Sequence, residues 1–283
     1  MSAMILKPDK IYAIYFSPTG GTKDAVRLLT GFLCEAMGMS SDSGGSPYEE
    51  IDFTAPAARE REYHFGAQDL VVIGSPVYAD RLPNKIMPDF RRCFSGEGTI
   101  AVPVVAYGNR SFGGALTELC MILQEAGFRI AGGAALVCRH SIADALAAGR
   151  PDEKDRDEIR DFADQIANKL NDPDGFEPLV MDPDEELPPY YTPRMEDGTP
   201  AKFLKAKPET DEEKCIRCGI CRDACPMGSI NEDMQVEGVC IKCQACVKSC
   251  PKQAKHITDE AFLGHMRMLE KNYVDHRAEN YFL

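Results

Sequence analysis

Eight of the twelve cysteines in this 283-residue chain fall into two copies of one spacing. Each copy reads C-x2-C-x2-C-x3-C-P and ends at a proline, Pro226 or Pro251. Three thiolates at such short intervals can surround an iron–sulfur cubane only if the backbone curls around it, and the fourth ligand must arrive from elsewhere. The chemistry that this pattern indicates is one-electron transfer. The cysteines are Cys215, Cys218, Cys221 and Cys225 in the first copy and Cys240, Cys243, Cys246 and Cys250 in the second.

This spacing resembles that of bacterial-type ferredoxins with two [4Fe–4S] clusters, over roughly residues 211 to 257. In that family the fourth cysteine of each run binds the other cluster. The resemblance therefore implies two crossed ligand sets. They are Cys215, Cys218, Cys221 and Cys250 for one cluster, and Cys240, Cys243, Cys246 and Cys225 for the other.

Zinc sites and disulfides are the alternative uses of clustered cysteines. Zinc sites usually pair one C-x2-C with a second, distant pair of ligands. Disulfides need an oxidising compartment. A run of four cysteines that is repeated as a whole fits both alternatives poorly.

A second motif lies near the start of the chain, between an apolar run and an amphipathic stretch. The run from Lys10 to Phe16 predicts a buried strand, and residues 25–36 have the apolar spacing of a helix that ends near Gly38. A loop that begins a helix can direct backbone N–H groups and hydroxyls at a phosphate. The loop resembles the flavodoxin phosphate loop, and this resemblance implies FMN phosphate binding by Ser17, Thr19, Gly20, Gly21 and Thr22.

Two further loops follow predicted strands, where open α/β sheets bind ligands. The first strand spans Asp69 to Ser75 and the second spans Ile100 to Ala106. In flavodoxins two such loops enclose the isoalloxazine ring, often with an aromatic side chain, and here Tyr78 is the best candidate for stacking. The candidate ring-binding residues are Pro76, Val77, Tyr78 and Ala79 in the first loop, and Tyr107, Gly108, Asn109 and Phe112 in the second.

Strands and helices alternate through the first 170 residues. Further strands are expected at Tyr48 to Phe53 and Ile130 to Cys138, and helices at Pro83 to Phe94, residues 115–126 and Pro151 to Leu170. Such alternation predicts a doubly wound parallel α/β sheet, and the phosphate loop after the first strand favours the flavodoxin-like order 2-1-3-4-5. The cysteine motifs add a small α+β domain of the bacterial ferredoxin type.

The predicted organisation has four parts. Residues 1–170 form the flavodoxin-like FMN-binding domain, and residues 211–257 form the ferredoxin domain. Between them, residues 171–210 are rich in proline and acidic residues, which favours an extended strap that holds the two domains together. Residues 258–283 are expected to form a helical tail that packs on the first domain or forms a dimer contact.

Composition limits the classes of function. The formal net charge of −13 argues against nucleic-acid binding and suits docking on a basic partner. No apolar run is long enough to span a membrane and the first ten residues do not resemble a signal peptide, so we expect a cytoplasmic protein. Reduced cysteines agree with that compartment. Neither H-E-x-x-H nor paired carboxylates occur, and no catalytic residue is assigned.

The whole chain resembles flavodoxin–ferredoxin fusion proteins of anaerobic bacteria and archaea. The resemblance implies an electron-transfer flavo-iron–sulfur protein with FMN and two [4Fe–4S] clusters that exchanges electrons with a partner oxidoreductase. A flavin accepts one or two electrons, so it can couple one-electron clusters to two-electron chemistry. The alternative is an FMN-dependent reductase with its own small substrate, in which Arg81 or Arg110 would receive an anion. Homo-oligomerisation stays open.

Overall fold

The computed structural model of the protein describes residues 8–39, 45–172 and 175–283. The sequence predictions for residues 1–7 and for Pro173 in the strap lie outside these described residues. We call residues 8–170 the sheet domain, residues 175–208 the strap and residues 209–257 the cysteine-rich region.

A parallel sheet forms the centre of the sheet domain, in the order β2-β1-β4-β6-β8. Counted along the chain, these are the five main strands in the order 2-1-3-4-5, which is the flavodoxin-like arrangement. The predicted fold class is therefore confirmed. The strands are β1 (Lys10–Tyr15), β2 (Glu49–Asp52), β4 (Asp69–Pro76), β6 (Ile100–Tyr107) and β8 (Ala134–Val137).

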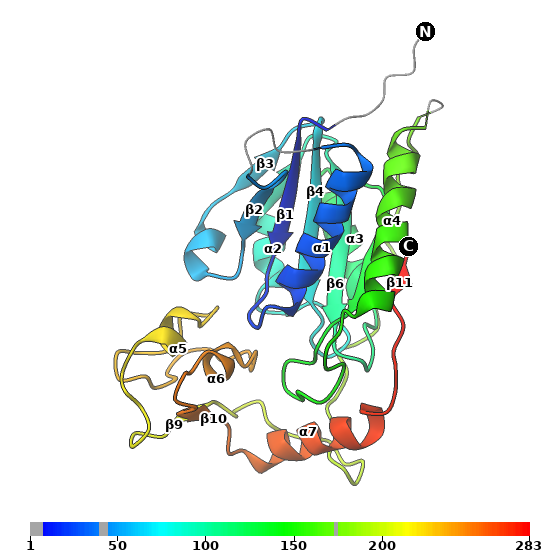
Figure 1. Cartoon of the computed structure of the whole chain (residues 1–283). Helices are drawn as coiled ribbons and strands as arrows, with labels where there is room; N and C mark the ends of the chain where they lie inside the picture. The colour runs from blue at the N-terminus through cyan, green and yellow to red at the C-terminus, as the bar shows by residue number, and fades with distance from the viewer. Residues whose placement is uncertain (1–7, 40–44, 173–174) are drawn as a thin grey trace.

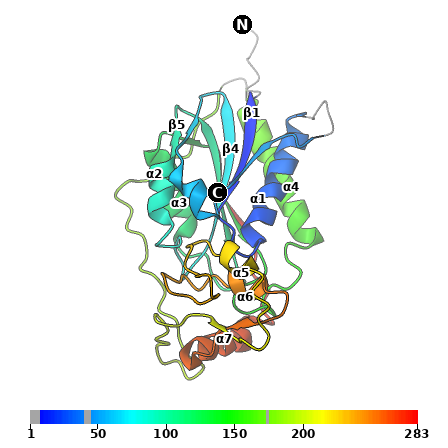
Figure 2. The same ribbon diagram turned by 90° about the vertical axis from the view of Figure 1, so that its left-hand side faces the viewer.

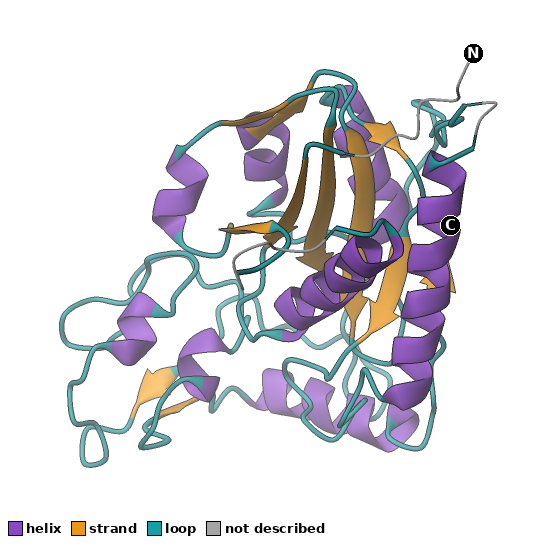
Figure 3. Cartoon of the chain, turned by 45° about the horizontal axis from the view of Figure 1, so that its top comes forward, coloured by secondary structure: helices purple, strands orange, loops and turns teal. Residues whose placement is uncertain are grey.

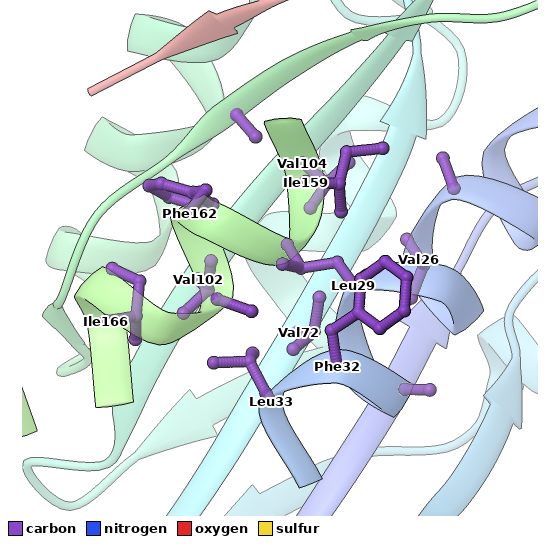
Figure 4. Packing of buried hydrophobic residues seen from close by; sticks show 14 of the residues in the cluster. Val26, Leu29, Phe32, Leu33, Val72, Val102, Val104, Ile159, Phe162 and Ile166 are labelled. Atoms are coloured by element: carbon purple, nitrogen blue, oxygen red, sulfur yellow. The ribbon is translucent and has the colours of Figure 1, made fainter. Parts of the chain in front are cut away.

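Helices cover both faces of this sheet (Figure 2). On one face α1 (Gly21–Ala36) and α4 (Glu153–Leu170) pack on the strands. Their apolar side chains meet those of the strands in one buried cluster (Figure 4). On the other face lie α2 (Met87–Cys93) and α3 (Ala115–Glu125). Burial of both faces explains why the central strands read as continuous apolar runs.

Several elements differ from the sequence prediction. The expected fifth strand is divided into β7 (Arg129–Ile130) and β8. At the end of β7, the carbonyl of Ile130 accepts a hydrogen bond from the backbone N–H of Leu179 in the strap. Helix α2 begins at Met87 and not near Pro83. The sequence analysis also missed three short elements. They are the 3-10 helix η1 (Pro56–Glu60) and the parallel pair β3 (Tyr63–Phe65) and β5 (Phe94–Gly96).

The C-terminal segment is more than a helical tail. Helix α7 (Glu260–Tyr273) packs its buried Met268 and Leu269 against Ala143 and Leu146 of the sheet domain. After it, β11 (Tyr281–Phe282) pairs antiparallel with β8 and extends the main sheet. The last residues therefore complete the edge of a sheet that begins at residue 10.

The cysteine-rich region lies beyond the carboxyl ends of the parallel strands, beside α7 (Figure 1). Most of it is loop, with little regular structure (Figure 3). It contains a two-stranded antiparallel sheet and two one-turn helices. These are β9 (Glu209–Thr210), β10 (Lys255–His256), α5 (Ile220–Asp223) and α6 (Ala245–Lys248).

Candidate functional site

The eight motif cysteines line two separate cavities in the cysteine-rich region. Cys215, Cys218, Cys221 and Cys250 line the first, which we call the outer cavity. Cys225, Cys240, Cys243 and Cys246 line the second, which we call the inner cavity. Each cavity thus gathers three cysteines of one run and the fourth of the other, as the ferredoxin resemblance implies. Apolar side chains such as Met234 and Ile230 complete the walls.

The two cysteine runs share a backbone pattern as well as a spacing. Arg217 and Lys242, each just before the second cysteine of a run, have positive φ angles of 53° and 58°. Gly219 and Gln244, each just after it, have φ angles of 81° and 66° and begin the one-turn helices α5 and α6. Left-handed residues on both sides of a cysteine curl the chain tightly. This repeated curl turns three side chains of each run toward one cavity.

The fourth cysteine of each run receives a hydrogen bond from the backbone. The N–H of Ser229 donates to Sγ of Cys225 at 3.4 Å, and the N–H of Ala254 donates to Sγ of Cys250 at 3.2 Å. Burial alone would raise the pKa of Cys250, but N–H groups of residues 252–255 outweigh it and the pKa is lowered. Four convergent thiols with N–H donors in an apolar wall are the ligand chemistry that a [4Fe–4S] cluster requires.

The predicted phosphate loop lies at the carboxyl end of β1. Gly20 has a φ of 94°, which suits glycine, and it stands immediately before α1. The backbone N–H groups of Gly21 and Thr22 are in the first turn of that helix, so they have no acceptor within it. Oγ of Ser17 accepts from the backbone N–H of Lys23 at 2.9 Å, which fixes the loop on the helix.

This loop faces a cavity that contains most of the predicted FMN residues. We call it the phosphate cavity, and it also includes His140, which the sequence analysis did not assign. No local spacing marks His140 as a site residue, because only the fold brings the segment after β8 to this edge. The predicted residues that line the cavity are Ser17, Thr19, Gly21, Thr22, Pro76, Val77, Tyr78, Tyr107 and Gly108.

Tyr78 begins a tight turn at the end of β4. The N–H of Tyr78 donates to the carbonyl of Arg81 at 2.9 Å, and the N–H of Arg81 donates to the carbonyl of Tyr78 at 3.2 Å. The two residues between them have positive φ angles, 52° for Ala79 and 69° for Asp80. Two non-glycine residues in the left-handed region mark a strained turn of the kind found at ligand sites. Burial raises the pKa of the Tyr78 phenol well above its usual range, and Cys243 and Cys240 contribute to this shift.

A larger cavity of about 890 Å³ joins the sheet domain to the cysteine-rich region. This central cavity shares Val77, Tyr78, Gly108 and His140 with the phosphate cavity. Cys240, together with its neighbours Val239 and Ile241, lines both the central and the inner cavity. The three cavities therefore form a continuous series from the phosphate loop to the motif cysteine Cys240.

Two predicted ring-binding residues serve another purpose. Asn109, whose φ is 67°, donates from Nδ2 to the carbonyls of Tyr273 and His276 at 2.8 and 2.5 Å and lines none of these cavities. Phe112 stacks on Tyr281 with ring centroids 5.4 Å apart. Both side chains anchor the C-terminal segment and neither lines the phosphate or the central cavity, so their assignment to the flavin stays a prediction. Ala79 lines the central cavity but not the phosphate cavity. Gly20 lines neither cavity, and its positive φ angle turns the chain into α1.

The two arginines expected to receive an anionic substrate already have acidic partners. Arg81 bonds to Glu118 through Nη2 at 2.6 Å, and Arg110 forms an ion pair with Asp80. Arg110 also lies over the ring of Tyr191 in the strap, 3.8 Å from its centroid. These side chains hold loops and strap together, and the structure does not leave them available for a substrate.

Comparison with protein families matches residues 208–231 to a 4Fe-4S binding domain and residues 237–254 to a second such domain. Together with the strand order of the sheet, these matches decide the identification. The chain joins a flavodoxin-like domain to a 4Fe-4S binding region. No curated protein matches the chain.

Several solved structures are similar to part of the chain. An archaeal flavodoxin has 16% identity and a TM-score of 0.36, over 57% of this chain and 98% of that one. A flavodoxin of Streptococcus pneumonia TIGR4 has 18% identity and a TM-score of 0.38, over 56% of this chain and 98% of that one. The Flv1 flavodiiron core from Synechocystis sp. PCC6803 has 14% identity and a TM-score of 0.39, over 60% of this chain and 38% of that one. The fold assignment itself rests on the strand order.

Within the described residues, no helix combines the length and the apolar character needed to cross a membrane.

Proposed function

We propose that the protein is an electron-transfer flavo-iron–sulfur protein that carries two [4Fe–4S] clusters and one FMN. The cysteines of the outer cavity would hold one cluster, and those of the inner cavity would hold the other. The phosphate loop would bind the FMN phosphate through Thr19, Gly21 and Thr22, with Ser17 supporting the loop. The isoalloxazine ring would enter the central cavity beside Tyr78 and Gly108.

The main support for this proposal is that Cys240 lines two cavities. This cysteine lines the inner cavity with three other thiols and also lines the central cavity beside Tyr78. A cluster on Cys240 would therefore lie next to the flavin ring, without any swing of one domain toward the other. The outer cavity shares no lining residue with the central one, and its Cys218 is exposed.

The outer cluster, the inner cluster and the flavin would follow one another in that order, which suits the passage of electrons between a partner and the flavin. Each cluster exchanges one electron, whereas FMN exchanges one or two. The exposed outer cluster would meet a partner oxidoreductase, and the inner cluster would relay electrons to or from the flavin. Fusion in one chain keeps the carriers at high effective concentration. Because eight thiols must stay reduced to bind iron, we place the protein in the cytoplasm.

An anaerobic visible spectrum tests the proposal directly. The purified protein should show flavin bands and a broad cluster absorbance, with about eight irons and one FMN per chain. Both chromophores should bleach with dithionite or with a reduced partner ferredoxin, and neither should bleach with NADH alone. Cluster absorbance without flavin would refute the proposal, and bleaching by NADH would replace it with a pyridine-nucleotide-dependent reductase.

A further inference from the structure

The charge of the central cavity is opposite to that of the protein. The chain has a formal net charge of −13, yet the cavity is lined by five cationic side chains and one carboxylate, that of Asp80. The cations are Lys85, Arg110, Lys205, Lys207 and Lys242. Since Asp80 is paired with Arg110, the four lysines of the lining have no carboxylate partner within it.

Within the described chain, these lysines are not neutralised by ion pairs. Nζ of Lys207 contacts only the backbone carbonyls of Val236 and Glu237, at 3.4 and 3.1 Å. Nζ of Lys242 donates to the carbonyls of Leu204 and Cys240, at 2.9 and 3.2 Å. Lys85 and Lys205, which both belong to the lining, have no hydrogen bond or ion pair to the described residues. Such a cavity favours an anionic occupant.

The flavin ring alone leaves much of this cavity unfilled. Pockets of about 300–1,000 Å³ hold a whole drug-sized ligand, and this one has about 890 Å³. The phosphate end of FMN would lie in the neighbouring cavity, so only its ring enters here. Aromatic side chains line this cavity as well, with the Phe203 and Phe262 rings 5.4 Å apart and Tyr190 and Tyr191 from the strap. These walls suit a flat apolar body.

Two histidines present complementary hydrogen-bonding groups to the same cavity. Nδ1 of His140 accepts from the backbone N–H groups of Ile142 and Ala143, both at 3.2 Å, so its neutral ring carries the proton on Nε2. Nδ1 of His265 lies 2.9 Å from the carbonyl of Arg194 and must donate, so its Nε2 is an acceptor. Neither Nε2 has a partner among the residues that the structure describes.

Both rings are kept neutral by their surroundings. Burial lowers the pKa of His140 to about 4, with His265, Lys248 and Arg110 acting in the same direction and Asp144 against it. Burial also lowers the pKa of His265, which is 6% exposed and packs on Phe203 with centroids 5.6 Å apart. The cavity therefore offers one unused N–H donor and one unused nitrogen acceptor.

We propose that the central cavity binds a small planar organic anion beside the flavin, with Lys85 and Lys205 attracting its negative group and His140 and His265 hydrogen-bonding its polar edge. This inference rests on the proposed function, because it places the ligand next to the FMN ring. It adds a small-molecule site to a chain that would otherwise serve only as a carrier between proteins. The exposed Leu204, Lys205 and Lys207 mark the mouth through which the ligand enters.

The test uses the protein loaded with flavin and clusters. The FMN content is measured first, because a protein without FMN would refute the proposed function before any ligand is added. The loaded protein is titrated with 2-naphthoate, with NADPH and with the uncharged 2-naphthalenemethanol. Binding is followed by calorimetry and by the flavin difference spectrum. We expect saturable binding of 2-naphthoate with a shift but no bleaching of the flavin bands, and at least tenfold weaker binding of NADPH and of the alcohol. Binding of 2-naphthoate without binding of NADPH would support a small planar anion, and tighter binding of NADPH, a large and flexible dinucleotide, would overturn that assignment.

Variants locate the binding in this cavity. Lys205→Met should weaken anion binding about three- to fivefold, and adding Lys85→Met should bring the loss to about tenfold, as expected for partly exposed charge pairs. Lys202→Met is the matched control, because Lys202 is an exposed strap lysine outside the cavity lining, and it should bind like the parent. The inference is overturned if 2-naphthoate does not bind, if added FMN displaces it, or if the Lys205 and Lys202 variants behave alike.

Discussion

The guanidinium of Arg59 in η1 donates a hydrogen bond to the carbonyl oxygen of Pro226, the residue that follows Cys225. The same group is held on the sheet domain by the carbonyl of Thr54 at 2.6 Å and by Asp89, whose Oδ2 lies 3.0 Å from Nε. Arg59 is 7% exposed. The buried side chain of Arg59 thus connects the flavodoxin-like sheet to the backbone beside the motif cysteine Cys225.

Replacing Arg59 by Met should loosen this connection. The variant leaves the buried carbonyl of Pro226 without its donor and Asp89 with only Arg92 as a partner, so we expect a loss of about 2–4 kcal/mol in the free energy of unfolding. Electron transfer between cluster and flavin should slow as well. Urea unfolding followed by circular dichroism gives the first quantity, and stopped-flow absorbance gives the second. Arg61→Met, an exposed neighbour, is the control; equal effects of both variants would contradict this role for Arg59.

Gly108 leaves the space that the ring of His140 occupies. A Cβ at position 108 would lie 2.2 Å from Cδ2 of His140, which is far inside van der Waals contact. Gly108→Ala should therefore displace the imidazole from the junction of the two cavities and weaken FMN binding at least about tenfold, with a stability loss of about 1–3 kcal/mol. Fluorescence titration of flavin-free protein measures the affinity.

A matched glycine variant should behave differently. A Cβ added at Gly31 in α1 would meet no atom within 4 Å. Gly31→Ala should leave FMN affinity unchanged and increase stability by up to about 1 kcal/mol, because alanine favours a helix. Equal FMN affinity of the two alanine variants would contradict the claim that a Cβ at position 108 weakens FMN binding.

Pairs of cysteine variants can test the crossed ligand sets. Cys225 and Cys240 line one cavity, whereas Cys215 and Cys225 belong to the same run but to different cavities. The double variant Cys225→Ala/Cys240→Ala should lose one cluster and keep about four irons. Cys215→Ala/Cys225→Ala should lose both clusters and keep almost none. Cys120→Ala, a buried cysteine outside the motifs, should keep all the iron; the opposite order of iron contents would show uncrossed binding.

The partly buried His140 should make stability depend on pH. Burial lowers its pKa to about 4 in the folded protein, whereas an unfolded histidine has a pKa of about 6.5. Between these values the unfolded chain binds a proton that the folded protein does not, so stability falls as the pH falls from 6.5 toward 4. The contribution lost between pH 7 and pH 5 is about 2 kcal/mol.

His140→Asn should remove this contribution, since an amide does not titrate. Unfolding of the parent and the variant at pH 7 and pH 5 measures the difference, and carboxylates that titrate in both proteins cancel. His276→Asn, at an exposed histidine, should keep the pH dependence of the parent. A parent and a His140 variant with the same pH dependence would show that His140 titrates alike in folded and unfolded chains.

Local features of the sequence were enough to predict the strand–helix alternation and the cysteine chemistry. The strands β1, β4 and β6 are buried on both faces, so their apolar runs are visible without any knowledge of their neighbours. The cysteine spacing is a property of one short segment, and its curled backbone is formed by residues within that segment. The phosphate loop likewise lies between a strand and a helix that are adjacent in sequence.

Only the tertiary structure decided how distant segments meet. Strand β11 has two residues, too few for a periodic pattern, and it forms because β8 offers an unpaired edge. Asn109 follows a predicted strand as a flavin residue would, yet its side chain is taken by backbone groups of residues 273–278, far along the chain. The central cavity arises where the sheet domain, strap, α7 and cysteine-rich region converge, and no spacing within one segment encodes such a surface.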